Sequence, residues 1–155
     1  GMIYKLFPAA KIIMMIRDPR DAVLSCFMQT FNHTTAMSKM YSLESTSAVY
    51  KQSFELYNQY IDVFNPVILE VKYEDLLDNT EKISREMTDF IGIEWDESVL
   101  RYYDKDKQRA TTTPSYEAVT KPIYKSSSGR WKNYQQHFNS QTLSNLEPFI
   151  KQFGY

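Results

Sequence analysis

The sequence predicts an α/β fold, a three-layer unit that is rich in helices and has a short parallel sheet. Two short apolar runs have the composition of buried strands, and segments with apolar residues at every third or fourth position lie between and after them. The chain has 155 residues, which is enough for one sizeable core and too few for two ordinary domains. We therefore expect residues 1–155 to form a single domain in which strands alternate with helices.

The first predicted strand is Lys11–Ile16, a continuous apolar run of the kind that is buried on both faces of a sheet. A polar stretch follows, in which Asp18 is a suitable N-cap and Pro19 a suitable first residue of a helix. The apolar pattern continues this helix to about Asn32. Arg20 belongs to its first turn, and we expect this side chain to face solvent.

A long amphipathic helix and a second strand are predicted next. Apolar residues recur at spacings of three and four through Leu43–Phe64, and Pro66 ends the helix. The β-branched, apolar segment Val67–Val71 is then the second buried strand. In an α/β unit, ligands bind beyond the carboxyl ends of such strands.

The third predicted helix begins with a capping box formed by Asp78 and Glu81 and stops at Gly92. Beyond it, Asp104–Arg130 has no sustained periodicity, and loops of this length are uncommon unless they have a function. Short closing helices are predicted from Trp131 onward.

Composition excludes several classes of protein. With Cys26 as the one cysteine and only two histidines, neither a disulfide nor a zinc cluster is expected. No apolar run is long enough to span a bilayer and the N-terminus does not resemble a signal peptide, so we expect a cytoplasmic protein without membrane contact. The Gly1-Met2 start suggests a piece of a longer protein.

The charge distribution favours a small anionic ligand. The formal net charge of −1 gives no reason to expect a nucleic acid partner. Between Arg101 and Lys132, however, eight Lys or Arg residues face three Asp or Glu residues, a local net charge of +5.

A phosphate site is predicted after the first strand. Arg17 follows the strand and Ser25 lies two helical turns later, so the guanidinium, the hydroxyl and the first helix amides could converge on one anion. The alternative is that Arg17 pairs with Asp18 or Asp21, while Ser25 only occupies the helix surface.

Tyr73 follows the second strand in the equivalent position, where its ring could stack on a planar base; otherwise it simply lies across the start of a helix. The basic loop combines cations with hydroxyl groups suited to phosphate or sulfate oxygens, and the alternative is solvated charge on a loop. These loop residues are Ser115, Lys121, Lys125, Ser126, Ser127, Ser128 and Arg130.

Three segments, in this order, resemble sulfotransferases that use 3′-phosphoadenosine-5′-phosphosulfate (PAPS): KIIMMIRDPRDAVLSCF (Lys11–Phe27), VKYEDL (Val71–Leu76) and KPIYKSSSGRW (Lys121–Trp131). The similarity is greatest to bacterial sulfotransferase domains that often follow tetratricopeptide (TPR) repeats and are related to tyrosylprotein sulfotransferases. The resemblance implies a partial P-loop-like fold, the carboxyl-terminal part of a sulfotransferase domain, with TPR repeats as a possible upstream partner.

The resemblance also implies roles for individual residues. Arg17 and Ser25 correspond to the pair that grips the 3′-phosphate, and Tyr73 to the residue that contacts adenine. The segment Ser115–Tyr124, which includes Thr120 and Lys121, corresponds to the one that wraps the nucleotide. Arg130 stands in the place of a basic residue before the family's Trp.

One departure affects the phosphate contacts of the loop. Cytosolic sulfotransferases have Arg-Lys-Gly where this chain has Tyr124-Lys125-Ser126, so the Arg and the Gly are missing. Lys125 and Ser126 are the residues left there to bind phosphate.

The family's catalytic base and phosphosulfate-binding loop precede the strand that corresponds to Lys11–Ile16. We therefore assign no catalytic residue in this chain and expect the chain alone to be inactive. The implied reaction transfers a sulfuryl group from PAPS, without a metal, to a hydroxyl or amine of a peptide, carbohydrate or small molecule, and leaves 3′,5′-adenosine bisphosphate. Two alternatives are a non-catalytic binding or assembly domain on the same scaffold and a P-loop kinase relative that acts on nucleotides.

Overall fold

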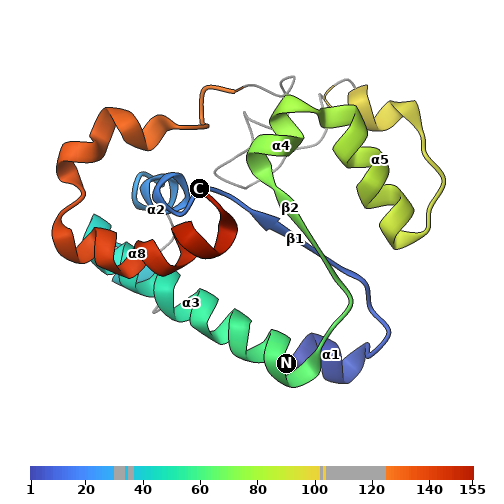
Figure 1. Ribbon diagram of the computed structural model, residues 1–155, viewed down its shortest axis with the longest axis horizontal. Coiled ribbons are helices and arrows are strands. Elements are labelled where there is room, and N and C mark those ends of the chain that lie inside the picture. The colour runs from blue at the N-terminus through green and yellow to red at the C-terminus, as the bar shows by residue number, and fades with distance from the viewer. Residues whose placement is uncertain (30–33, 35–36, 102, 104–124) are drawn as a thin grey trace. The chain divides into compact units, whose positions relative to one another are not determined.

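The computed structural model describes residues 1–29, 34, 37–101, 103 and 125–155 (Figure 1). Its contacts divide the chain into two compact units. The helical unit comprises Gly1–Pro8, Arg17–Pro66 and Ser126–Tyr155, and the sheet unit comprises Ala9–Ile16 and Val67–Lys125. The helices and the short parallel sheet confirm the predicted α/β class.

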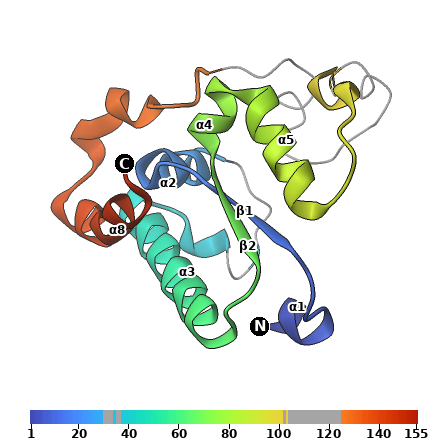
Figure 2. The same cartoon turned by 45° about the vertical axis from the view of Figure 1, so that its right-hand side comes forward.

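The sheet unit is built on two parallel strands, β1 (Ile12–Ile16) and β2 (Ile68–Lys72), which lie side by side in Figures 1 and 2. Both strands were predicted. The prediction that the first strand is buried on both faces is wrong, because only Ile16 of β1 is buried and Met15 is 38% exposed. Within the described residues the sheet has two strands, so each strand has a neighbouring strand along one edge only.

In the described part of the sheet unit, β2 is followed by α4 (Tyr73–Asp78), α5 (Thr80–Ile91) and the 3-10 helix η2 (Glu97–Arg101). The predicted capping box at the start of α5 is wrong. Asp78 is the last residue of α4, so the N-cap of α5 is Asn79, and Glu81 pairs with Arg85 instead. Gly92 ends α5 in the left-handed conformation (φ 84°), as predicted.

The helical unit contains six helices among the described residues: α1 (Met2–Leu6), α2 (Pro19–Phe27), η1 (Met37–Lys39), α3 (Leu43–Phe64), η4 (Arg130–His137) and α8 (Ser140–Phe153). Asp18 caps α2 and Pro19 is its first residue, as predicted. The helix ends at Phe27, earlier than the predicted Asn32. Its C-cap is Met28, whose amide donates to the carbonyl oxygens of Leu24 and Cys26.

The core of the helical unit lies between α2, η4 and α8, where Val23, Leu24, Phe138 and Leu146 form one buried cluster. Helix α3 packs on α8 in both views (Figures 1 and 2). The small buried Ser47 allows this approach, and its hydroxyl accepts a hydrogen bond from Asn145 Nδ2 at 3.0 Å. Helix α2 is therefore packed against a buried core.

Candidate functional site

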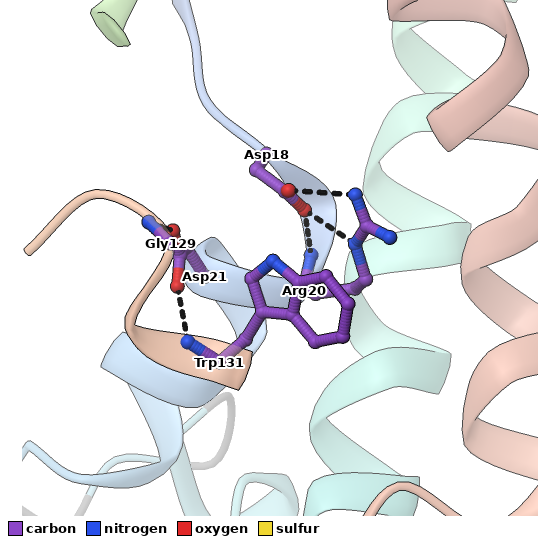
Figure 3. Close-up of polar contacts among 5 residues, drawn as sticks. All are labelled: Asp18, Arg20, Asp21, Gly129 and Trp131. Carbon is purple, nitrogen blue, oxygen red and sulfur yellow. Dashed lines mark hydrogen bonds and ion pairs between the residues drawn. The ribbon is translucent and has the colours of Figure 1, made fainter. Parts of the chain in front are cut away.

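The first turn of α2 is tied to Ser126–Trp131, which we call the serine turn. One carboxylate makes two of the bonds: Asp21 Oδ2 accepts from the Gly129 amide at 2.6 Å, and Oδ1 accepts from the Trp131 amide at 2.7 Å (Figure 3). Arg17 Nη2 donates a third bond to the carbonyl oxygen of Ser127. These bonds join residues more than 100 positions apart in the sequence.

Arg20 lies between a carboxylate and an aromatic ring. It forms an ion pair with Asp18 at 2.7 Å, and its guanidinium carbon lies 4.0 Å from the centre of the Trp131 ring (Figure 3). Its side chain is 19% exposed. The expectation that Arg20 faces solvent is therefore wrong, because the serine turn brings the Trp131 ring over it.

One of the first amides of α2 is already bonded within the chain. The Arg20 amide already donates to Asp18 Oδ1 at 2.9 Å, and both Asp18 and Asp21 are buried in this turn. Negative charge stabilises a helix N-terminus, and here the Asp18 and Asp21 carboxylates supply that charge.

Arg17 acts electrostatically on two residues of α2. Burial raises the pKa of the Cys26 thiol, and the Arg17 charge opposes that rise. Burial also raises the pKa of Asp21, and the bonds from the Trp131 and Gly129 amides and the Arg17 charge oppose that rise. The half-buried Ser25 lies between these two residues on α2.

The remaining predicted residues lie on different parts of the structure. Arg130 and Ser126 are exposed on the serine turn of the helical unit. Lys125, at the end of the sheet unit, is exposed and forms an ion pair with Asp78. Ser115, Thr120 and Lys121 lie outside the described residues, as does most of the predicted Asp104–Arg130 loop.

Tyr73 is the half-buried first residue of α4 in the sheet unit. The preceding residue, Lys72, pairs in register with Ile16 of β1, the residue before Arg17. The backbone therefore confirms that Arg17 and Tyr73 each follow the carboxyl end of a strand, and that these two strands are neighbours.

Comparison with known proteins identifies the family. The model of the Sulfotransferase family matches residues 1–97, well over half of the chain. The chain belongs to the sulfotransferase family. The matched range contains Arg17, Ser25 and Tyr73, whereas the serine turn lies beyond it. The match argues against the alternative of a nucleotide kinase.

Individual relatives extend the similarity over almost the whole chain. An uncharacterized protein of Aquifex aeolicus is 30% identical over 139 residues, covering 88% of this chain and 18% of the relative. Protein-tyrosine sulfotransferase 2 of Gallus gallus is 24% identical over 97% of this chain and 42% of its own length. Protein-tyrosine sulfotransferase A of Caenorhabditis elegans is 25% identical, with corresponding shares of 97% and 40%. The chain thus spans less than half the length of these relatives.

Two further properties of the described residues bear on the site. No three His, Cys, Asp or Glu side chains in that part of the chain lie together in a way that could hold a metal ion. Among the helices that the structure describes, none combines the length and the apolar character needed to cross a membrane.

Proposed function

We propose that this chain supplies the part of a sulfotransferase that binds the 3′-phosphate and adenine of PAPS and of its product, 3′,5′-adenosine bisphosphate. The observation that carries the proposal is the position of Arg17, which is bonded to the serine turn and acts electrostatically on the part of α2 that contains Ser25. A guanidinium is the cation best matched to phosphate oxygens.

Each residue has a distinct part in this proposal. Arg17 and Ser25 bind the 3′-phosphate, with Arg130 as a second cation on the serine turn, and Tyr73 contacts the adenine. Lys125 and Ser126 bind phosphate. Ser115, Thr120 and Lys121 belong to the preceding segment, which wraps the nucleotide. When bound, PAPS supplies the sulfuryl group that passes to the acceptor. Such a transfer depends on an aligned acceptor and on cations that offset the developing charge.

The proposed acceptor is a hydroxyl group on a peptide. The relatives from Gallus gallus and Caenorhabditis elegans are named protein-tyrosine sulfotransferases, which favours a peptide over the carbohydrate or small molecule considered from the sequence. A cytoplasmic location and upstream TPR repeats stay predictions.

Two isomeric nucleotides test the phosphate site directly. Adenosine 3′-monophosphate and adenosine 5′-monophosphate have the same charge and composition, so a difference in affinity reports the position of the phosphate. We expect the chain to bind 3′,5′-adenosine bisphosphate and to prefer the 3′ isomer, with dissociation constants measured by NMR titration. Arg17→Ala should weaken bisphosphate binding by roughly tenfold to a hundredfold, the effect of losing a charge-assisted contact.

Lys151→Ala is the matched control, because it also removes one positive charge from the helical unit, and Lys151 is an exposed residue of α8 paired with Glu147. Its affinity for the bisphosphate should not change. Equal losses in the two variants would show that net charge, not a site at Arg17, attracts the nucleotide. No binding by the unaltered chain would favour the alternative of a non-catalytic domain on the same scaffold.

A further inference from the structure

Asp21 connects the two parts of the proposed phosphate site within the helical unit. Its own helix, α2, carries Ser25 one turn later, and its two carboxylate oxygens hold the amides of Gly129 and Trp131, which flank Arg130 (Figure 3). Fixing the residues on both sides of Arg130 fixes the backbone from which that side chain extends. No other side chain bond to either amide is present in the described residues.

A carboxylate at this position has a cost. Asp21 is 1% exposed, and burial raises its pKa, so the fold opposes the charged form that accepts both bonds. Its negative charge would also repel a phosphate bound nearby. A carboxylate at this position therefore costs stability and weakens the attraction for a phosphate. Its advantage is geometric. An ionised Asp is a short, acceptor-only group with two oxygens, which suits two amides that converge on one point.

We propose that Asp21 is a positioning residue for the 3′-phosphate site. It holds the serine turn against α2 so that Arg130 and the Arg17–Ser25 pair act on the same phosphate. This inference rests on the proposed function and adds a requirement to it: the cations bind the 3′-phosphate together only while the carboxylate bridges the two segments. Asp21 itself does not contact the ligand.

The sign of one substitution separates this role from the alternatives. Asp21→Asn removes a negative charge, so on electrostatics alone it would strengthen phosphate binding. A purely structural role would change stability but leave the preference for adenosine 3′-monophosphate over the 5′ isomer as it is. Positioning predicts that the preference falls, by about tenfold, the scale of one lost charge-assisted contact. The measurement is the ratio of the two dissociation constants, by NMR titration of the folded variant.

Two further variants complete the experiment. Asp62→Asn neutralises an exposed carboxylate on α3 and should leave the preference unchanged. Gly129→Ala loosens the serine turn from its other side without changing any charge, because Gly129 has a φ of 70°, which side chains rarely adopt. This variant should lose the preference as Asp21→Asn does, and it supplies the test if Asp21→Asn does not fold.

The outcomes for the two proposals are distinct. An unaltered chain that does not prefer the 3′ isomer would overturn the proposed phosphate site, and the role of Asp21 with it. An unaltered chain with the preference, together with an Asp21→Asn variant that keeps or increases it, would overturn the positioning role alone. If Asp21→Asn does not fold, a preference retained in Gly129→Ala overturns that role in the same way.

Discussion

Two arginines in this protein each lie between a carboxylate and a tryptophan ring. Arg20 pairs with Asp18 at 2.7 Å and lies 4.0 Å from the Trp131 ring, and Arg85 pairs with Glu81 at 2.8 Å and lies 4.4 Å from the Trp95 ring. The groups are alike, but their surroundings differ. The partners of Arg85 are close in the sequence: Glu81 is one helical turn away and Trp95 is ten residues later. Arg20 instead stacks on a ring that is more than 100 residues away in the sequence.

The difference in exposure follows from this difference in sequence distance. The side chains of the Arg20 pair are 19% and 10% exposed, and those of the Arg85 pair are 43% and 57% exposed. A distant segment that folds over a pair shields it from water, which a neighbouring turn does less well. A carboxylate, an arginine and a tryptophan ring thus stabilise a helix surface in the sheet unit. In the helical unit, the same combination joins two segments of the proposed site.

The largest expected effect on stability comes from removing the two tryptophan rings. Trp131→Ala should lower the free energy of unfolding by about 3 kcal/mol, because the Trp131 ring covers Arg20 and also packs against the core that includes Phe138. Trp95→Ala should cost about half as much. Urea unfolding followed by circular dichroism measures both. Equal losses would contradict the view that only the distant ring closes over a buried pair.

The arginines should differ in the same direction by a smaller amount. Arg20→Ala should cost about 2 kcal/mol, since it removes the stacking on Trp131 and leaves the buried Asp18 carboxylate without this partner. Arg85→Ala should cost less than about 1 kcal/mol, because Glu81 can be solvated. The same urea experiment applies, and a larger loss for Arg85→Ala would reverse the comparison.

Asp21 should give a smaller effect that depends on pH. Burial raises its pKa above the usual 3.8, so the folded state binds this proton more readily than the unfolded state. Its ionisation therefore destabilises the fold as pH rises through that pKa. Relative to Asp21→Asn, the unaltered chain should gain stability as pH falls from 7 toward 4, and the gain should level off below about 3.8. A difference that shrinks toward acid pH would show that the bonds to Gly129 and Trp131 outweigh burial.

The smallest expected effect concerns salt. Glu81→Gln should cost only about 0.3–0.5 kcal/mol, as for other exposed pairs one turn apart on a helix, and this cost should vanish in 1 M NaCl. Asp18→Asn should keep most of its cost at the same salt concentration, since ions screen buried pairs much less. If salt abolished both costs, the Arg20 pair would be as solvated as the Arg85 pair.

Local patterns in the sequence predicted much of the fold. Helix α3, with bounds Leu43–Phe64, and the N-cap of α2 at Asp18 follow from periodicity and capping chemistry that act within one or two turns. The error at Asp78 has a local cause too, because the short helix α4 already includes that residue and no capping pattern marks it.

The candidate site was predicted less completely. The positions of Arg17 and Tyr73 after neighbouring parallel strands follow from the order of the elements, and the structure confirms them. The bonds from Asp21 to Gly129 and Trp131 have no signal in the sequence, where Asp21 was considered only as a partner for Arg17. Contacts between segments more than 100 residues apart depend on how helices pack, which local patterns do not determine.

The distance between these segments has a consequence during synthesis of the protein. Asp21 leaves the ribosome 108 residues before Gly129, a delay of roughly 5–20 s at ordinary rates of translation. Until the serine turn emerges, the carboxylate stays hydrated and Arg20 has no ring to stack on. We infer that the proposed phosphate site is assembled only after the serine turn has been made, and that nascent chains ending before Ser126 do not retain the nucleotide.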